Sequence, residues 1–183
     1  MAGIKTKIQE IAGEVVLQRK AARMKREKTV VNLLEARSIG LVYKVTDERL
    51  FNAVKRLIKE LTNDKRQVMA LGFVDDDTIP DYCVAAYSGY YFNRKALNWY
   101  KAPKSDYIHT FISKEYDILI DLSSSYDYII KYIVALSQAR FKVGRQRRGF
   151  SNYYDLMLRM KKSDSYQDYI EQAIHYLTVL KSK

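Results

Sequence analysis

Short apolar runs alternate with helical segments over most of the chain. The runs are typical of buried strands and lie at 38–43, 67–74, 117–122, 141–144 and 153–160. Amphipathic helices are expected after residue 47, at 126–138 and at 166–180. Such alternation predicts right-handed βαβ units. We therefore expect a three-layer α/β fold with a mainly parallel, Rossmann-like or flavodoxin-like sheet of about five strands.

The ends of two predicted helices carry capping residues. Thr46 or Asp47 is placed to cap the helix that follows the first strand, and the serines at 123–125 are placed to cap the helix at 126–138. The stretch 78–115 is harder to interpret because prolines and aromatic residues interrupt it. It predicts a short helix near 81–87, a short strand near 91–97 and a helix near 105–114.

The N-terminal segment predicts one long helix over 4–28. Its apolar residues Ile4, Ile8, Ile11 and Val15 recur at helical spacing and form one face. This face is expected to dock on the rest of the protein or on another protein. We expect two parts, a basic amphipathic helix within 1–30 and a single α/β domain over 31–183.

The second half of this helix carries a basic stripe formed by Arg19, Lys20, Arg23 and Arg26. Three interpretations are open: a solvated helix surface, a contact with nucleic acid, or a contact with an anionic membrane. The apolar face lacks Trp, Phe and Leu, and it precedes the basic part. This order favours nucleic acid over a membrane.

Positive charge is concentrated in two places. The net charge is +11, yet residues 29–139 carry 14 basic and 14 acidic side chains. Residues 1–28 carry eight basic and three acidic side chains, and residues 140–148 carry five basic side chains and no acidic one. A neutral body with two basic segments indicates a polyanionic partner.

The second basic segment contains Arg145, Arg147 and Arg148, which follow a predicted strand end. Guanidinium groups suit phosphate oxygens, so these three are candidate nucleic-acid contacts. The alternative is a solvated loop, or a loop paired with the acidic residues 75–77.

A ligand pocket is a further possibility, because doubly wound sheets bind ligands at the carboxyl ends of their strands. Asp75, Asp121, Ser123 and Ser124 are expected there. The alternative is that they form a solvated turn, a strand end and a helix cap. Three adjacent aspartates at 75–77 cannot all face one ion without an unusual loop, so no metal site is expected.

No catalytic signature and no cofactor motif is present. The first predicted strand is followed by Lys44–Asp47 without a glycine, so neither common phosphate-loop pattern occurs. His109 and His175 lack a partner at a catalytic or metal-binding spacing, and the only cysteine, Cys83, excludes an internal disulfide. We expect a cytoplasmic protein, since the N-terminus lacks the apolar run of a signal peptide and no run approaches the roughly 20 residues of a membrane span.

Two resemblances add expectations. The whole chain resembles an uncharacterised family of unknown function from Bacteroidetes, through ARSIG at 36–40, ALGF at 70–73, FNRKALNWY at 92–100 and DILIDL at 117–122. That resemblance implies a bacterial, cytoplasmic, compact α/β protein and supplies no activity.

The second resemblance is local and weakly specific. Over about 30 residues, YDILIDL, ALSQA and FKVG in 116–144 are similar to part of the N-terminal domain of heptosyltransferase-type glycosyltransferases. The chain is too short for the second domain of those enzymes, so transferase activity is not expected.

Together these observations predict a non-enzymatic, nucleic-acid-associated protein that binds structured RNA, for instance on the ribosome, through its two basic clusters. The alternatives are an accessory protein at a membrane surface, related to glycosyltransferases, or a small-ligand-binding α/β protein. A protein partner of the N-terminal helix is also open.

Overall fold

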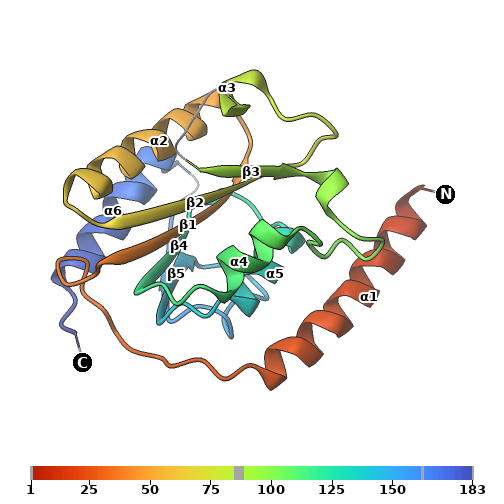
Figure 1. The fold of residues 1–183 in the computed structure, drawn as a ribbon, viewed down its shortest axis with the longest axis horizontal. Helices are drawn as coiled ribbons and strands as arrows, with labels where there is room; N and C mark the ends of the chain where they lie inside the picture. Colours follow the sequence, from red (N-terminus) through yellow and green to blue (C-terminus); the bar gives the residue numbers. More distant parts are fainter. Residues whose placement is uncertain (1, 85–88, 162, 183) are drawn as a thin grey trace.

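The protein is built around one parallel sheet. A computed structural model describes residues 2–84, 89–161 and 163–182. The strands in that part of the chain are β1 (Ser38–Val45), β2 (Gln67–Val74), β3 (Tyr90–Asn93), β4 (Ile118–Asp121), β5 (Phe141–Arg145) and β6 (Leu156–Leu158). They are hydrogen-bonded in the order β3-β2-β1-β4-β5-β6, and every pair is parallel (Figure 1).

The predicted α/β class and parallel sheet are confirmed. The strand order is that of a Rossmann-type doubly wound sheet, so it decides between the two topologies that the sequence left open. The sheet has six strands rather than about five, because the short strand expected near 91–97 joins it as the edge strand β3. The long β2 has the predicted bounds, whereas β6 is three residues long within a predicted run of eight.

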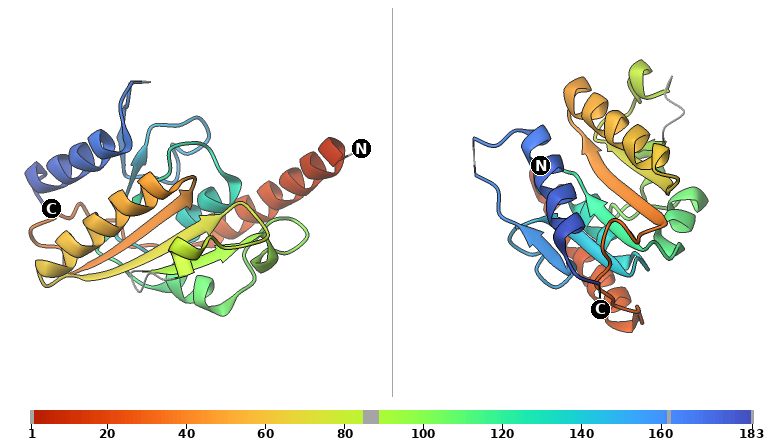
Figure 2. Two further views of the ribbon diagram at one scale, coloured as in Figure 1. Left: turned by 90° about the horizontal axis from the view of Figure 1, so that it is seen from above. Right: turned by 90° about the vertical axis from the view of Figure 1, so that its left-hand side faces the viewer.

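Helices cover both faces of the sheet and give the three predicted layers (Figure 2). One face carries α2 (Glu48–Asn63) and α6 (Tyr166–Val179). The opposite face carries α4 (Asp106–Ser113) and α5 (Tyr128–Leu136), and α1 (Ala2–Arg23) packs against α5. Helices α2, α4, α5 and α6 therefore bury apolar residues against the sheet, whereas α1 lies on α5.

Between β2 and α4 lie short elements only. They are α3 (Asp81–Val84), β3 and the 3-10 turn η1 (Arg94–Ala96). The predicted strand and second helix of this stretch are present in shorter form, and the first helix is present over its described residues 81–84. The end of the helix expected near 81–87 falls on 85–87, outside the described residues.

One of the two expected helix caps is confirmed and the other is wrong. Asp47 is extended, with φ −161°, and its carboxylate accepts a hydrogen bond from the Leu50 N–H at 2.9 Å. Helix α5 is capped by Asp127, which accepts from the Ile129 N–H at 2.8 Å. None of the serines at 123–125 caps it, and the Ser123 hydroxyl instead accepts a hydrogen bond from the Lys44 N–H.

Helix α1 packs on the α/β domain through a face other than the predicted one. Ile8, Ile11 and Val15 are 58%, 66% and 43% exposed, so the expected docking of this face on the rest of the protein is wrong for them, and its docking on another protein stays a prediction. The side chain of Ile4 lies outside the described part of the structure. Leu17, on the other side of the helix, is fully buried.

The docked face of α1 is mainly polar and small. Glu10 pairs with Lys101 at 2.8 Å, and Glu14 pairs with the buried Lys131 at 2.7 Å. Between them Gly13 lies so close to Tyr128 that an added Cβ atom would be 2.4 Å from its hydroxyl. The docked face of α1 is therefore determined by ion pairs and by the close approach of Gly13 to Tyr128. The periodicity of the apolar residues did not reveal this face.

The helix also ends earlier than predicted, at Arg23 rather than near residue 28. Residues 24–37 run without a helix or strand along the domain to β1 (Figure 1). Among the helices of the described residues, none combines the length and apolar character that a membrane span requires.

Candidate functional site

The carboxyl ends of β1 and β4 form the switch point of the sheet. From β1 the chain enters α2 on one face, and from β4 it enters α5 on the other. Neighbouring strands whose connections leave in opposite directions create a crevice beyond their carboxyl ends, where doubly wound sheets place ligands. The predicted pocket residues all lie at this edge of the sheet.

Asp121, at the end of β4, is part of a buried network. Its side chain is 0% exposed and contacts Arg147 at 3.2 Å, the Tyr154 hydroxyl and the Ser123 N–H. Arg147 also donates to the carbonyl oxygen of Ser123. Burial, followed by the charge of Asp121, holds the pKa of Tyr154 well above its usual value. These groups already satisfy one another, so this network holds the loops after β4 and β5 together.

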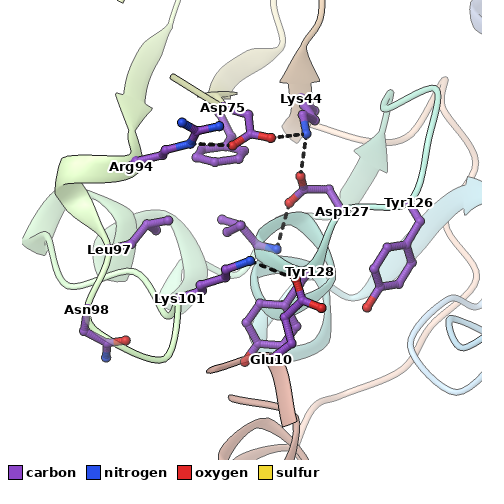
Figure 3. A pocket seen from close by; sticks show the side chains of 12 residues that line it. Glu10, Lys44, Asp75, Arg94, Leu97, Asn98, Lys101, Tyr126, Asp127 and Tyr128 are labelled. Carbon is purple, nitrogen blue, oxygen red and sulfur yellow. Dashed lines mark hydrogen bonds and ion pairs between the residues drawn. The ribbon is translucent and has the colours of Figure 1, made fainter. Parts of the chain in front are cut away.

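A first cavity lies at the carboxyl ends of β1 and β2, on the side of α5 (Figure 3). Its volume is about 520 Å³. Lys44 lies between two carboxylates, at 2.7 Å from Asp75 and 3.0 Å from Asp127 (Figure 3). Arg94 contacts the other oxygen of Asp75 at 2.8 Å.

The charges in this first cavity are balanced. Burial alone would lower the pKa of Lys44, but its hydrogen bonds to Asp75 and Asp127 outweigh burial and raise it. Likewise, burial would raise the pKa of Asp75, but Lys44 and Arg94 outweigh burial and lower it. With both oxygens of Asp75 paired, this residue is not free to hold a cation. The described residues contain no group of three potential metal ligands.

A second cavity, called here the Arg145 cavity, lies on the opposite face between the starts of α2 and α6. Its volume is about 550 Å³. It is lined by Asp47, Arg49, Ala53, Arg56, Ser124, Arg145, Asp164, Ser165, Tyr166 and Gln167.

Arg145 is the unusual group in this second cavity. It stacks on the ring of the buried Tyr169, 4.3 Å from its centre, which places the guanidinium at the end of β5. Its Nε and Nη2 atoms are buried and have no hydrogen-bond partner among the described residues. Burial accordingly lowers the pKa of Arg145. A buried donor without an acceptor costs free energy, so this site favours an anion.

The predicted ligand-pocket residues do not share one cavity. Asp75 lines the first cavity and Ser124 lines the Arg145 cavity. Asp121 and Ser123 are 0% exposed and form the network that joins the loops. The sequence placed all four at the correct edge of the sheet, but it did not reveal that the two faces separate them.

The predicted nucleic-acid contacts in and after α1 fall into two groups. Arg19 and Arg23 are exposed. Arg26 instead donates to both oxygens of Asp155 at 2.7 Å, and its side chain is 7% exposed. Lys20 donates to the Tyr132 hydroxyl at 2.9 Å, a bond that raises its pKa.

The predicted contacts after β5 divide in the same way. Arg148 is exposed, whereas Arg147 is paired with Asp121 and Arg145 lines its cavity. The charges of Arg26 and Arg147 are thus neutralised inside the protein. The alternative pairing of this loop with residues 75–77 is wrong for Arg147, whose partner is Asp121.

The two basic clusters lie at opposite ends of the strands, one at the amino ends and the other at the carboxyl ends. Arg26 donates to the carbonyl oxygens of Ala139 and Arg140, immediately before β5 begins. Arg145 and Arg148 lie at and beyond the end of the same strand. A single flat contact with both clusters is therefore disfavoured.

Several residues of the site were missed from the sequence. Lys25 and Lys28 are exposed beside the predicted stripe but do not continue its spacing. Arg49 and Arg56 lie seven residues apart on α2 and line the Arg145 cavity. That spacing places them on one side of a helix, and this signal was available in the sequence.

The remaining candidates for chemistry stay separate from these cavities. His109 and His175 are exposed. Cys83 is 1% exposed, and burial raises the pKa of its thiol to about 11. Low thiolate content makes Cys83 a poor nucleophile.

Comparisons with known proteins identify a family and no activity. No curated protein and no solved structure matches the chain. The model of a family of unknown function, DUF6913, matches residues 9–180. The match takes in both the docked part of α1 and the whole sheet. The chain therefore belongs to this family of unknown function, DUF6913.

Proposed function

We propose that the protein associates with structured nucleic acid, RNA in particular, through a basic surface formed by Arg19, Arg23, Lys25 and Lys28. All four side chains are exposed, and none forms an ion pair within the described part of the chain. Unpaired cations on one short segment are suited to phosphate oxygens, which supply most of the affinity in nucleic-acid binding. This exposed, unneutralised segment is the observation that carries the proposal.

The segment is held in place by Arg26 and Lys20. Arg26 joins it to Asp155, and Lys20 joins the end of α1 to Tyr132 on α5. The Thr29 N–H also donates to the carbonyl oxygen of Arg140 at 3.1 Å. Fixing the backbone beforehand lowers the entropy lost on binding. Arg26 is thus paired inside the protein, whereas Lys20 is exposed and also joins α1 to α5.

Contacts through phosphates suit a structured RNA better than a single strand. Recognition of single strands relies on aromatic side chains that stack on bases. The exposed aromatic residues of the described part, Tyr90, Trp99, Tyr107, Tyr126 and Tyr176, lie on other elements. Association with ribosomal RNA is the specific form of this proposal, and its contacts would position the protein without reading a sequence.

A second candidate function is favoured by the exposed stripe of Ile8, Ile11 and Val15. An apolar stripe on the outer side of α1, followed by Arg19 and Arg23, is a pattern that binds anionic membrane surfaces. An accessory protein of a glycosyltransferase at such a surface belongs to this second candidate.

One comparison separates the two candidates. A first variant replaces Arg19, Arg23, Lys25 and Lys28 with Gln, and a second replaces Ile8, Ile11 and Val15 with Ser. Each is tested for binding to a ribosomal RNA fragment by fluorescence anisotropy and for flotation with vesicles that contain phosphatidylserine.

The RNA proposal expects binding that the first variant loses and the second keeps. Flotation of the wild-type protein that both variants lose, without RNA binding, would replace it with the membrane function. Replacing the exposed Lys55, Lys59, Lys95 and Lys104 with Gln removes the same charge elsewhere and is the matched control. If the control loses as much RNA affinity as the first variant, the binding is a property of net charge alone.

A further inference from the structure

We propose that the Arg145 cavity binds a small phosphorylated polyol, such as a sugar phosphate. The proposal does not depend on nucleic-acid binding, because the cavity and the basic surface lie at opposite ends of the strands of the sheet. A volume of about 550 Å³ is sufficient for a small metabolite.

Arg145 supplies the first reason for a phosphate. Two of its guanidinium nitrogens are buried and lack a partner in the described residues, and stacking on Tyr169 restrains the group. A fixed fork of N–H donors matches the oxygens of a phosphate monoester. An anion in the cavity would bring a negative charge to this restrained guanidinium.

Arg49 and Arg56 supply the second reason. Both lie on α2, line the same cavity and form no ion pair within the described part of the chain. With Arg145 they provide three cations at one cavity. The start of α6 also lines the cavity, but the capping box of Ser165 and Asp168 already closes this helix end, so the positive charge comes from the three arginines.

The other side of the lining is suited to hydroxyl groups. The carboxylates of Asp47 and Asp164 would repel a bare phosphate, but they accept hydrogen bonds from hydroxyls. Ser124 adds a hydroxyl group, whereas the Ser165 hydroxyl and the Gln167 amide are already bonded to Asp168 and Glu171.

The apolar residues of this lining are Ala53 and Tyr166. Cations together with carboxylates and a hydroxyl therefore favour a phosphorylated polyol over a free phosphate.

A third cavity adjoins the Arg145 cavity at the carboxyl ends of the strands. It shares Ser124, Arg145 and Asp164 with the Arg145 cavity and adds Lys161. Arg147 also lines it, but the pair with Asp121 holds that side chain at the wall. Arg145 thus lies where the two cavities meet.

The test measures binding of ribose 5-phosphate and glucose 6-phosphate by calorimetry and by thermal unfolding. Ribose, glucose and inorganic phosphate serve as comparison ligands. We expect one of the sugar phosphates to raise the Tm by roughly 5–10 °C at about 100 times its Kd. Arg145→Met and the double variant Arg49→Gln/Arg56→Gln should each weaken its binding at least about tenfold.

The controls make the result specific. Lys55→Gln/Lys59→Gln removes the same charge from exposed positions of α2 outside the cavity and should leave the affinity unchanged. Arg49 and Arg56 are exposed, so their double variant should fold even if Arg145→Met does not.

The proposal is overturned if neither sugar phosphate binds at millimolar concentration, or if the double variant keeps full affinity. Equal affinity for inorganic phosphate would overturn the assignment of a polyol. Loss of RNA binding in Arg145→Met, without any binding of a sugar phosphate, would instead assign the cavity to nucleic acid. Failure of the basic surface to bind RNA leaves this proposal unaffected.

Discussion

Arg26 and Asp155 form a two-pronged ion pair, with both N–O distances at 2.7 Å. The pair joins the segment after α1 to the start of β6, across 129 positions of the sequence. Asp155 also accepts from the Lys142 N–H at 2.9 Å, which ties the same carboxylate to β5. An arginine from the basic stripe therefore acts as an internal anchor, and its neighbours remain available at the surface.

Replacing Asp155 with Asn should destabilise the protein by about 3 kcal/mol, because it leaves the largely buried Arg26 without a counter-charge. The free energy of unfolding from urea titrations measures this effect. The freed segment should also be cut faster by trypsin between residues 19 and 28.

The control for this change is Glu27→Gln. Glu27 is 77% exposed and lies 3.7 Å from Arg140, so its loss should cost less than about 1 kcal/mol. Equal losses of stability for the two variants would show that Arg26 is not an anchor.

Gly13→Ala should destabilise the contact between α1 and the domain by about 1–3 kcal/mol. The added Cβ atom would lie 2.4 Å from the Tyr128 hydroxyl and 2.6 Å from the carbonyl oxygen of Tyr100. In an isolated helix the same change stabilises, because alanine has the higher helix propensity. Urea unfolding of the variant therefore distinguishes the two effects. A lower free energy of unfolding indicates close packing of Gly13, and a higher one indicates that helix propensity dominates.

Tyr128→Phe tests the same contact independently. The Tyr128 hydroxyl is buried and has no hydrogen-bond partner among the described residues, so its removal should cost little. Combined with Gly13→Ala, it should recover part of the stability, since the closest clash is removed while those with the Tyr100 carbonyl oxygen and the Cζ atom of residue 128 remain. A double variant no better than Gly13→Ala alone would contradict the packing of α1 on α5.

The stability of the protein should depend on pH because of the buried Lys142. Burial, followed by the charge of Arg26, lowers its pKa from 10.5 to about 7, while its amino group donates to the Val134 carbonyl at 2.7 Å. Between about pH 7 and pH 10.5 the unfolded chain binds the proton that the folded protein releases. The contribution of Lys142 to stability therefore rises with pH across this range and is constant below it.

Lys142→Met should remove this rise. The variant should gain stability relative to the wild type near pH 6, and the gain should shrink toward pH 10. Urea titrations at four pH values between 6 and 9.5 measure the difference. A difference that does not change with pH would show that Lys142 keeps an ordinary pKa in the folded state.

Much of the fold could be predicted because its signals are local. The run Gln67–Val74 is apolar enough to be buried on both faces, and Asp47 precedes a helical pattern directly. The number of strands was underestimated, because β3 is only four residues long and lies in the stretch that prolines and aromatic residues interrupt. Such a short strand is defined by its neighbour rather than by its own sequence.

The site was less predictable because charge alone does not reveal pairing. Arg26 and Arg148 look equivalent in the sequence, yet one is held by Asp155 and the other is exposed. The docked face of α1 was missed for the same reason. Glu10 and Glu14 form ion pairs with lysines that lie more than 90 positions away in the sequence. No periodic pattern of the sequence indicates which residues pair over such a separation.

The most direct test of the proposed function is the salt dependence of RNA binding. The logarithm of the affinity for a ribosomal RNA fragment should fall linearly with the logarithm of the salt concentration. Replacing Arg19, Arg23, Lys25 and Lys28 with Gln should reduce the slope by roughly one unit for each phosphate that is no longer neutralised. The control with Lys55, Lys59, Lys95 and Lys104 replaced should keep the wild-type slope. An affinity that does not change with salt, or an equal slope in all three proteins, would contradict the assignment of this surface to nucleic acid.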